Sequence, residues 1–532
     1  MNSPIPSLDS MNAAALRTMV LELLAEHGDL QQELALTQQL LTRQDQLVAR
    51  QQDEIRYKEV RIAQLVHEVA MLKRVRFGKK GEQLPGIQGT LLEDTVAADL
   101  AAVQAELEVL KGAPLERKKM GQAKRTPLPA HLPRIDILHE PESSVCKCGC
   151  QLLRIGEDVA EKLDYTPGAF TVERHIRGKW VCKTCTTLVQ APVPAQVIDK
   201  GVATPGLLAQ VLIAKYADHL PLYRQEKIFE RAGLKLSRST LAEWVGVCGV
   251  HLQPLADALR EGILAHDVVH ADETPVQMLK PGTLKTHRAY LWAYATGAFE
   301  NVRAVVYDFT EGRSGEYARQ FLGEWKGKLV CDDYGGYKAS FAQGVTEVGC
   351  MAHARRKFFE LFTNHKSQLA EQALGYFAKL YEVEAEARDL DHESRRQWRQ
   401  RHAKPMADAL FTWMQAQRER VPEGSATAKA LDYSLKRWVA LTRYLDDGSL
   451  PIDNNHVENL IRPIALGRSN WLFAGSLRAG KRAAAVMSLV QSARLNGLDP
   501  YAYLKDVLTR LPTQPASRIE ELLPHCWQSK TE

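Results

Sequence analysis

The sequence predicts a multidomain protein in which a coiled coil, a small cysteine-rich β module and a helical region precede an α/β domain that carries a helical insertion. Three observations predict this organisation. A heptad repeat of apolar residues runs through roughly the first 75 residues. Five of the nine cysteines fall between 146 and 185, and strand-like runs follow one another after residue 266. A chain of 532 residues has room for three to four domains of about 150 residues each.

Composition and charge exclude several classes of protein. The chain is 45% hydrophobic and 25% charged, which is ordinary for globular protein and excludes a collagen-like, wholly disordered or disulfide-scaffold chain. No apolar run approaches the ~18 residues of a membrane-spanning helix. The opening MNSPIPSLDS lacks the basic and apolar regions of a secretory signal. A formal net charge of +5 is too small to identify a nucleic-acid partner by itself.

The N-terminal helix carries an apolar seam. Its members recur every seven residues: Leu34, Leu41, Val48, Ile55, Ile62 and Val69. This spacing is typical of a coiled coil, although the second seam position is polar for four heptads before it becomes apolar. We expect a homodimer formed through this helix. The alternative is a long amphipathic helix that packs on its own domain.

Basic residues follow the heptads in two stretches. The first includes Lys79 and Lys80, and the second spans 111–134 with four prolines. Proline prevents a continuous helix there. We therefore predict a coiled coil with a basic motif over 1–84 and a basic, proline-containing linker over 85–140. Such a linker either attracts phosphate groups or is simply solvated.

The cysteines between 146 and 185 indicate a metal site. Cys182-x-x-Cys185 is a knuckle whose two thiolates can reach one tetrahedral Zn²⁺. The other ligands come from CKCGC, as Cys148 with either Cys146 or Cys150. The residues between the two groups alternate enough to form a β-hairpin, which would bring the groups together. We predict a zinc-binding module over 141–195, and the alternative is a set of reduced, buried thiols.

Residues 196–255 predict a helix-turn-helix region. Pro205 is well placed to open a helix. A break at Gly233 precedes a second helix, with Ser237 or Ser239 as its N-cap. A recognition helix contacts DNA bases through its N-terminal end. The residues predicted to do so are Arg238, Ser239 and Thr240.

Strand-like runs after residue 266 indicate a mixed α/β sheet. Asp272 ends the first run and Asp332 ends the fourth, while Glu458 lies at the margin of a later helix that Pro463 is expected to kink or end. Three converging carboxylates would suit two Mg²⁺ or Mn²⁺ ions that hold a phosphodiester. Ordinary solvated or helix-capping acids are the alternative for each one.

Basic, amide and aromatic side chains surround Glu458 in sequence, a combination suited to a groove for the end of a DNA strand. The predicted DNA contacts are Arg462, Arg468 and Asn470, beside Trp471 and Phe473. Upstream, Cys350-x-x-His353 is either a metal pair or the end of a strand and the start of a helix. No second pair stands near it, so we interpret it as structural.

Seven segments, in order, carry a resemblance that covers nearly the whole chain. They are RFGKKGEQL at 76–84, the cysteine-rich segment ending in CKTC, HADETPVQ at 270–277, CDDYGGYKA at 331–339, GCMAHARRKFFE at 349–360, DNNHVENLIRPIALGRSNWLFAGS at 453–476 and NGLDPYAYL at 496–504. The chain resembles transposases of the insertion sequence 66 family, bacterial enzymes with a DDE-type, RNase H-like catalytic domain.

The resemblance implies a reaction and its residues. Asp272, Asp332 and Glu458 would be the catalytic carboxylates that hold two Mg²⁺ (or Mn²⁺) ions. Asp332 rather than Asp333 is assigned because YGGY follows the pair. Water would cleave the phosphodiester at the transposon end, and the freed 3′-OH would attack target DNA. The resemblance also implies a catalytic domain over 256–480, a helical insertion at about 365–445 and a C-terminal helical segment over 481–532.

The zinc module, the helix-turn-helix region and the basic linker would bind the terminal inverted repeats. Accessory proteins of the same element and a bacterial cytoplasmic location, at the nucleoid when DNA is bound, are further expectations. Three rival interpretations stay open: an idle transposase-derived regulator, a scaffold built on the coiled coil, and a stand-alone RNase H-like nuclease. Metal-dependent nicking at a repeat end would separate the transposase from the regulator.

Overall fold

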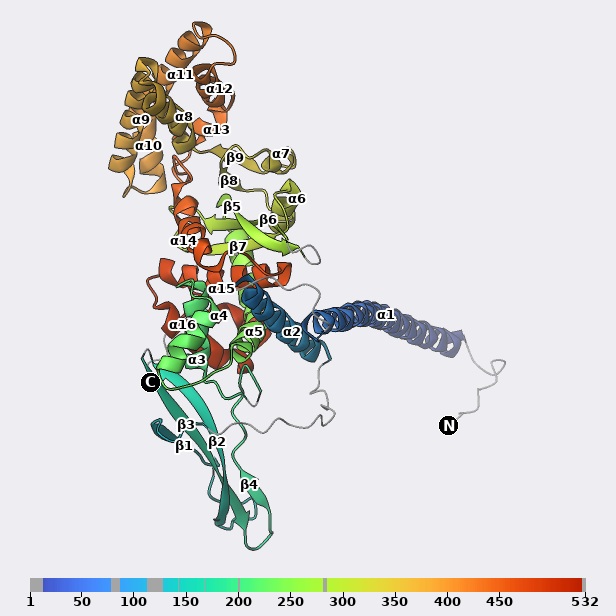
Figure 1. Ribbon diagram of the computed structural model, residues 1–532. Coiled ribbons are helices and arrows are strands. Elements are labelled where there is room, and N and C mark those ends of the chain that lie inside the picture. Colours follow the sequence, from blue (N-terminus) through green and yellow to red (C-terminus); the bar gives the residue numbers. More distant parts are fainter. Residues whose placement is uncertain are drawn as a thin grey trace. The chain divides into compact units, whose positions relative to one another are not determined.

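The computed structural model describes residues 13–77, 87–111, 128–280 and 285–528, apart from residues 142, 167 and 200. The chain divides into two compact units. One contains 1–71 and 107–115, and the other contains 72–106 and 116–532. Figure 1 labels the helices and strands of both. In the described part of the chain, no helix combines the length and the apolar composition needed to cross a bilayer.

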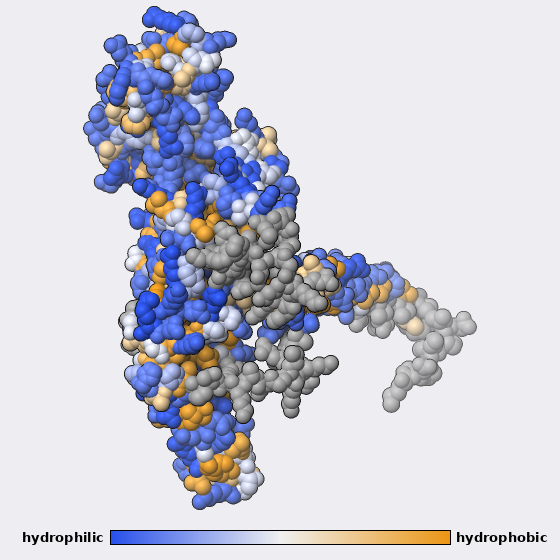
Figure 2. All heavy atoms as spheres, viewed as in Figure 1, coloured by the Kyte–Doolittle hydropathy of each residue, from blue (hydrophilic) through white to orange (hydrophobic). Residues whose placement is uncertain are grey.

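The predicted N-terminal helix is confirmed as α1 (Ala13–Phe77). Its apolar seam is exposed as far as Ile55, because Leu34 and Leu41 each keep 60% of their surface and Ile55 keeps 56%, while Ile62 and Val69 are half-buried. Figure 2 shows hydrophobic residues among hydrophilic ones along α1. Exposed apolar side chains at heptad spacing are what a coiled-coil strand presents to a partner, so self-association stays a prediction. The basic pair Lys79 and Lys80 lies outside the described residues.

The predicted linker over 85–140 contains two regular elements. Helix α2 (Ile87–Lys111) fills most of its first half, and strand β1 (Arg134–His139) ends it. Alanine and leucine dominate the second half of α2, and both favour a helix. Its residues 96–103 are mostly buried. Residues 112–127, which hold much of the basic stretch, lie outside the described part.

The cysteine-rich module is a four-stranded sheet, and the predicted hairpin is confirmed. Strand β2 (Leu152–Thr166) runs antiparallel to β3 (Ala169–Cys182), and their register pairs Leu152 with Cys182. β1 lies parallel to β3, and β4 (Leu188–Gln190) runs antiparallel to it. The register brings the residues that precede β2 to the end of β3, where the second cysteine pair begins.

Three helices follow: α3 (Pro205–Tyr216), α4 (Leu222–Arg231) and α5 (Arg238–Leu264). Pro205 opens α3 as predicted, and Ser237, rather than Ser239, caps α5 through its hydroxyl. Gly233 takes a φ of +86°, which favours glycine. Apolar residues continue at helical spacing beyond residue 255, and α5 therefore runs through that predicted domain boundary. Helices α3 to α5 share one apolar core with the sheet that follows.

The α/β domain contains the predicted mixed sheet. Its strands are β5 (Val268–Lys280), β6 (Lys285–Thr296), β7 (Val305–Thr310), β8 (Lys328–Cys331) and β9 (Thr346–Gly349). The spatial order is β7-β6-β5-β8-β9. The first three strands form an antiparallel meander, and β8 and β9 continue the sheet in parallel from β5. The remaining elements between β7 and β9 are short: α6 (Gly315–Leu322), η2 (Gly335–Tyr337) and α7 (Lys338–Ala342).

Helices occupy the predicted insertion, begin before it with α8, and share an apolar core with Val268, Val330 and Val348 of the sheet. They are α8 (Met351–His365), α9 (Gln368–Ala387), α10 (His392–His402), α11 (Lys404–Glu419), α12 (Ala426–Lys436), α13 (Trp438–Thr442) and η3 (Arg443–Leu445). Phe358, Phe377 and Leu410 are fully buried in that core. Hydrophilic residues predominate over these helices on the face in Figure 2, as expected for an outer helical layer.

The C-terminal part returns to the sheet. Its elements are α14 (Asn455–Trp471), α15 (Leu477–Leu495), α16 (Pro500–Arg510), η4 (Leu511–Thr513) and η5 (Ala516–Leu522). α15 crosses the predicted boundary at residue 480. Of the two outcomes predicted for Pro463, a kink or the end of its helix, the end is wrong, because α14 continues to Trp471. The carbonyl that Pro463 leaves unbonded belongs to exposed Asn459 and can face water.

Candidate functional site

Strand register places two of the predicted carboxylates side by side. β5 and β8 are parallel neighbours, and His270 pairs with Val330. Asp272 and Asp332 each lie two residues further along, so the same register extended by two residues sets them next to each other. Side chains at matching positions of adjacent strands point to the same face. The prediction that Asp272 ends a strand is wrong, because β5 continues to Lys280 and Asp272 pairs with Ala293 inside the sheet. Asp332 does follow the end of β8, so the two residues are neighbours on the sheet rather than at a shared edge.

The pKa of Asp272 reflects its burial and the negative charges around it. Burial, together with the nearby carboxylates of Glu273, Asp332 and Glu458, raises that pKa to about 8. Like charges close to a buried carboxyl disfavour its ionised form. Asp332 and Glu458 thus both act electrostatically on Asp272. A divalent cation is the partner that would relieve such repulsion.

Asn454 holds the start of α14 against the sheet. Its side chain is fully buried; its Nδ2 donates to the carbonyl of Ala271 at 2.9 Å, and its Oδ1 lies 2.8 Å from Nδ1 of His270. Its own N–H donates to the sulfur of Cys350 at 3.2 Å. Glu458 lies one turn further along α14 and donates its N–H to the Asn454 carbonyl. The position of Glu458 is therefore tied to strand β5.

Two side chains of α8 face the Glu458 carboxylate. Arg356 approaches Oε2 at 3.3 Å, and Nδ1 of His353 lies 3.6 Å from Oε1. Among the described residues, the groups of three ligand atoms within 4.8 Å of one another include Glu458 but neither Asp272 nor Asp332. The three carboxylates share one region without forming a closed set of ligands. Arg356 could not be predicted from the sequence, because nothing local relates α8 to a residue 102 positions away.

Asp333 has a different environment from Asp332. Its carboxylate lies 3.4 Å from Arg437 and is half exposed. The Asp332 carboxylate accepts the N–H of Tyr334 at 2.9 Å, and it is Asp332 that acts on Asp272. This difference supports the assignment of Asp332 as the member of the pair that belongs to the site.

Glu273 supports the loop that follows β8. Its side chain is 2% exposed, forms an ion pair with Arg313 and accepts a hydrogen bond from the hydroxyl of Tyr337 at 3.3 Å. Arg313 packs on the Tyr334 ring, 4.1 Å from its centre. Gly336 is required there, because a Cβ would lie 2.1 Å from the same ring. The sequence did not predict that Glu273 supports this loop, and the acidic residue next to Asp272 in HADET was the signal that could have indicated it.

Four cysteines converge at the end of the β module. The ligand atoms of Cys146, Cys148, Cys182 and Cys185 all lie within 4.8 Å of one another. Neighbouring sulfurs are 3.3 to 3.6 Å apart, close to the ~3.8 Å edge of a tetrahedron with 2.3 Å zinc–sulfur bonds. Cys150, the alternative to Cys146, lies outside this group. The donor set fits structural Zn²⁺.

Turns and hydrogen bonds shape this cluster. Gly149 and Thr186 take positive φ angles of 82° and 56°, and their N–H groups donate to the carbonyls of Cys146 and Cys182, each at 2.8 Å. The Thr187 hydroxyl lowers the pKa of Cys185 to about 6. A thiolate is the form that binds metal, so both turns and Thr187 prepare the ligands.

The predicted DNA contacts fall into two groups. Arg238 lies 3.4 Å from Asp94 and 3.8 Å from Glu226, and its neighbours Ser239 and Thr240 hydrogen-bond to the Ser237 hydroxyl. These side chains are engaged within the protein. Arg468 donates to the Pro275 carbonyl at 2.6 Å and joins α14 to β5. The exposed members are Arg462 and Asn470, both on α14.

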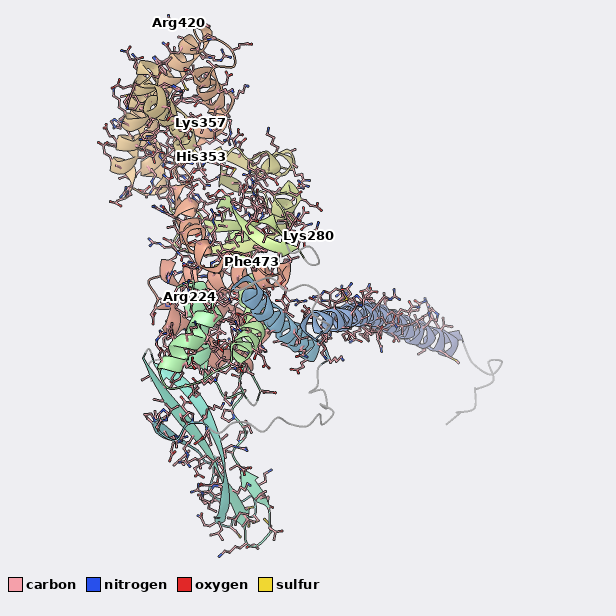
Figure 3. All side chains as sticks on the ribbon, viewed as in Figure 1. Arg224, Lys280, His353, Lys357, Arg420 and Phe473 are labelled. Carbon is pink, nitrogen blue, oxygen red and sulfur yellow. The ribbon has the colours of Figure 1, made fainter. Side chains whose placement is uncertain are left out.

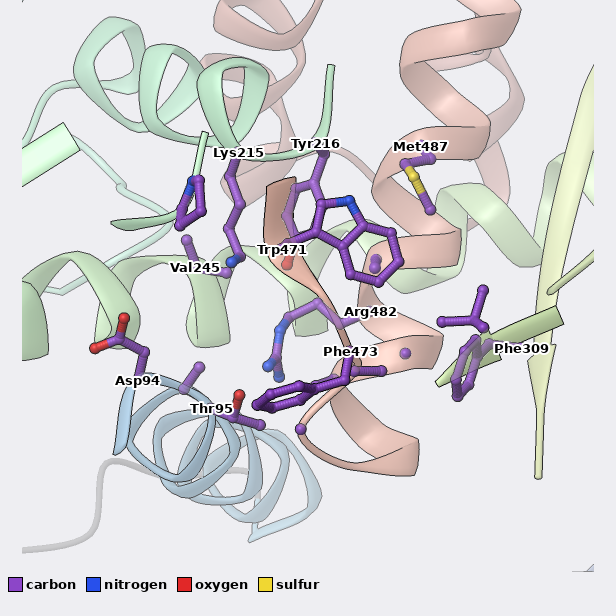
Figure 4. A pocket seen from close by; sticks show the side chains of 18 of the residues that line it. Asp94, Thr95, Lys215, Tyr216, Val245, Phe309, Trp471, Phe473, Arg482 and Met487 are labelled. Atoms are coloured by element: carbon purple, nitrogen blue, oxygen red, sulfur yellow. The ribbon is translucent and has the colours of Figure 1, made fainter. Parts of the chain in front are cut away.

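A pocket of about 100 Å³ lies beneath the end of α14. Side chains from α2, α3 and the segment after α14 converge on it, as Figure 4 shows. Trp471 and Phe473, predicted to flank an open groove, line this pocket instead, with Lys215 and Arg482. Phe473 is only 8% exposed. The segment is drawn inwards because Ala474 pairs with Met278 of β5.

A mixed sheet with acidic side chains at neighbouring strands, together with a four-cysteine module, defines a multidomain protein with one acidic site and one metal-stabilised module. Comparison with family models is more specific. The model described as "Transposase IS66 family" matches residues 200–482, and the "zinc-finger binding domain of transposase IS66" matches 143–186. The "IS66 C-terminal element" matches 488–525, and "Transposase C of IS166 homeodomain" matches 64–137. The chain belongs to the IS66 transposase family.

Relatives of similar length occur in Sinorhizobium fredii (strain NBRC 101917 / NGR234). The protein y4qI is 36% identical over 522 residues, which cover 94% of this chain and 96% of the relative. The protein y4jD is 36% identical over 485 residues, 87% of this chain and 94% of that relative. Both are described as uncharacterized. The family domains support a transposase that binds DNA, and the first model spans α3 to α5 together with the sheet, in agreement with their shared core.

Proposed function

We propose that this chain is a DDE-type transposase with an RNase H-like catalytic domain, which binds terminal inverted repeats, cleaves the phosphodiester at the transposon end and joins it to target DNA. The observation that carries the proposal is the common region of Asp272, Asp332 and Glu458, where each carboxylate adds to the repulsion at Asp272. The antiparallel meander continued by two parallel strands supports the proposed domain class.

Asp272, Asp332 and Glu458 would hold two Mg²⁺ or Mn²⁺ ions, which prefer the oxygen donors that these residues supply. When bound, such ions activate water and stabilise the departing 3′ oxygen. Asn454 orients the helix that carries Glu458, and Glu273 with Arg313 holds the loop that carries Asp332. A Ser or Tyr nucleophile is not needed for this chemistry.

DNA would be held by exposed cations and amides around this region. Arg462 is exposed one turn after Glu458 on α14, and Asn470 is exposed in the last turn of the same helix. Cations at such positions attract phosphate groups. Lys79, Lys80 and the zinc module are proposed to contact the repeats as well. Two copies would meet through α1, whose exposed apolar seam has the spacing of a coiled-coil interface.

The test is a cleavage and strand-joining assay on a labelled duplex that carries the flanking inverted repeat. Wild type is compared with Asp332→Asn and, as a matched control, Asp333→Asn. Mg²⁺ is added or omitted rather than chelated, so that the zinc module stays intact. We expect Mg²⁺-dependent nicking at the repeat end, lost in Asp332→Asn and retained in Asp333→Asn, with end binding unchanged in a gel-shift assay.

Binding without cleavage in Mg²⁺ or Mn²⁺ would instead identify a transposase-derived regulator. Equal loss of cleavage in both variants would remove the basis for assigning Asp332. A loss of end binding in Asp332→Asn would identify that residue as structural.

A further inference from the structure

A second cluster of metal-binding side chains lies where α8 and α14 begin. Cys350 is the N-cap of α8 and His353 lies in its first turn, while Glu458 reaches them from α14. The ligand atoms of Cys350, His353 and Glu458 all lie within 4.8 Å of one another. Figure 3 labels His353 near the start of α8. The sulfur, nitrogen and oxygen donors come from segments more than 100 residues apart.

Two atoms of this cluster are buried and have no hydrogen-bond partner. They are Nδ1 of His353 and Oε1 of Glu458, and they face each other at 3.6 Å. A hydrogen bond between them would be shorter, at about 2.7–3.2 Å. Two ligands bound at about 2.0–2.1 Å in a tetrahedral site lie roughly 3.4 Å apart. The observed separation therefore fits an ion between the two atoms.

The third ligand is placed as a metal-binding thiolate would be. Cys350 is fully buried, and its sulfur accepts the N–H of Asn454 at 3.2 Å. It also lies at the N-terminus of α8, a 15-residue helix, and the positive end of the helix dipole favours an anion. Both features favour the thiolate but are outweighed by burial, which raises the pKa of the Cys350 thiol to about 12, so a bound cation would be needed to hold the charged form.

We propose that Cys350, His353 and Glu458 form a Zn²⁺ site, separate from the four-cysteine module, with water in the fourth position. Thiolate and imidazole donors select a borderline-soft ion over Mg²⁺. Zn²⁺ replaces the thiol proton of Cys350, which passes to solvent. The ion ties the start of α8 to the first turn of α14 and fixes one oxygen of Glu458. The site stands whether or not the chain cleaves DNA.

Arg356 has to adjust when the ion binds. Its Nη1 lies 3.4 Å from Nε2 of His353. Binding of Zn²⁺ at Nδ1 requires the ring proton on Nε2, which is then a donor that faces another donor. The Arg356 side chain is 50% exposed, so its guanidinium can turn into solvent at little cost.

The test counts zinc in the full-length protein. Wild type and variants are incubated with Zn²⁺, freed of excess by gel filtration and measured by plasma emission spectrometry. We expect two zinc ions per chain in wild type and one in each of Cys350→Ser, His353→Gln and Cys182→Ser. The matched control is Cys248→Ser, which changes an equally buried cysteine outside both clusters and should keep two.

A second measurement uses Co²⁺ in the Cys182→Ser protein, where the proposed site remains. Sulfur-to-cobalt absorption should appear with Cys350 present and vanish in Cys182→Ser/Cys350→Ser. One zinc in wild type that Cys350→Ser leaves unchanged would overturn the proposal, as would an equal zinc loss in Cys248→Ser. Asp332→Asn should keep both ions, so failure of the DNA-cleavage proposal and failure of this one are distinguishable.

Discussion

Asn454→Ala should loosen the start of α14 and with it the position of Glu458. The change removes two buried side-chain hydrogen bonds, one with His270 at 2.8 Å and one with the carbonyl of Ala271 at 2.9 Å. A buried polar group that loses its partner costs about 1–3 kcal/mol. Two such groups give roughly 2–6 kcal/mol against the folded position of the helix start.

Hydrogen exchange measures this effect locally, in peptides that span the first turns of α14. Each 1.4 kcal/mol changes an equilibrium tenfold, so exchange there should accelerate about thirtyfold or more. The matched control is Asn455→Ala, because the Asn455 side chain is exposed and bonds only to the neighbouring Asp453. Equal exchange rates in the two variants would refute the claim that Asn454 fixes the helix.

Three further outcomes are expected. Arg482→Met should lower the free energy of unfolding by about 3–5 kcal/mol, because it leaves Asp99 without its ion-pair partner in a pair that is at most 5% exposed. Arg478→Met breaks a half-buried pair between the same two helices and should cost at most about 1 kcal/mol. Similar unfolding midpoints of the two variants in urea would contradict this difference. Burial lowers the pKa of Lys215 from 10.5 to about 8. The unfolded chain therefore binds the proton more strongly, and the stability of the folded state rises as the pH rises from 8 to 10.5. Lys215→Met should raise the Tm at about pH 7 and raise it less at about pH 10, whereas a gain in Tm that does not depend on pH would exclude burial of the charge as its cause. Paired Leu41→Lys and Val48→Lys should halve the mass measured by light scattering if α1 forms the dimer, and a wild-type monomer would remove that interface.

Local patterns were enough to predict many elements. Heptad spacing predicted α1, alternation predicted the hairpin of β2 and β3, and Pro205 predicted the start of α3. Each of these signals depends on residues close together in the chain. The carboxylates Asp272 and Asp332 were also recognisable, because each follows or ends a strand-like run and belongs to a motif that resembles the family.

Features that depend on contacts between residues far apart in the chain could not be predicted from the sequence. The sequence predicts a linker where α2 lies, because prolines and basic residues follow it and the burial of α2 depends on packing rather than on local pattern. α5 continues through Pro254 because its apolar face is covered by the sheet domain. The pairing of His270 with Asn454 spans 184 residues. Cys350 and His353 looked like an isolated pair because their partner, Glu458, comes from beyond the helical insertion.

The helical insertion leaves the sheet and returns to it at almost the same point. The N–H of Met351 donates to the carbonyl of Ile452 at 3.1 Å, so about 100 residues begin and end at one hydrogen bond. A segment with adjacent ends can vary in length at little cost, because the chain entropy of closing such a loop rises only with the logarithm of its length. Exchanging the helices beyond α8 for shorter or longer ones, with His353 and Arg356 kept against Glu458, should alter what the protein contacts and offers an engineering route to new specificity.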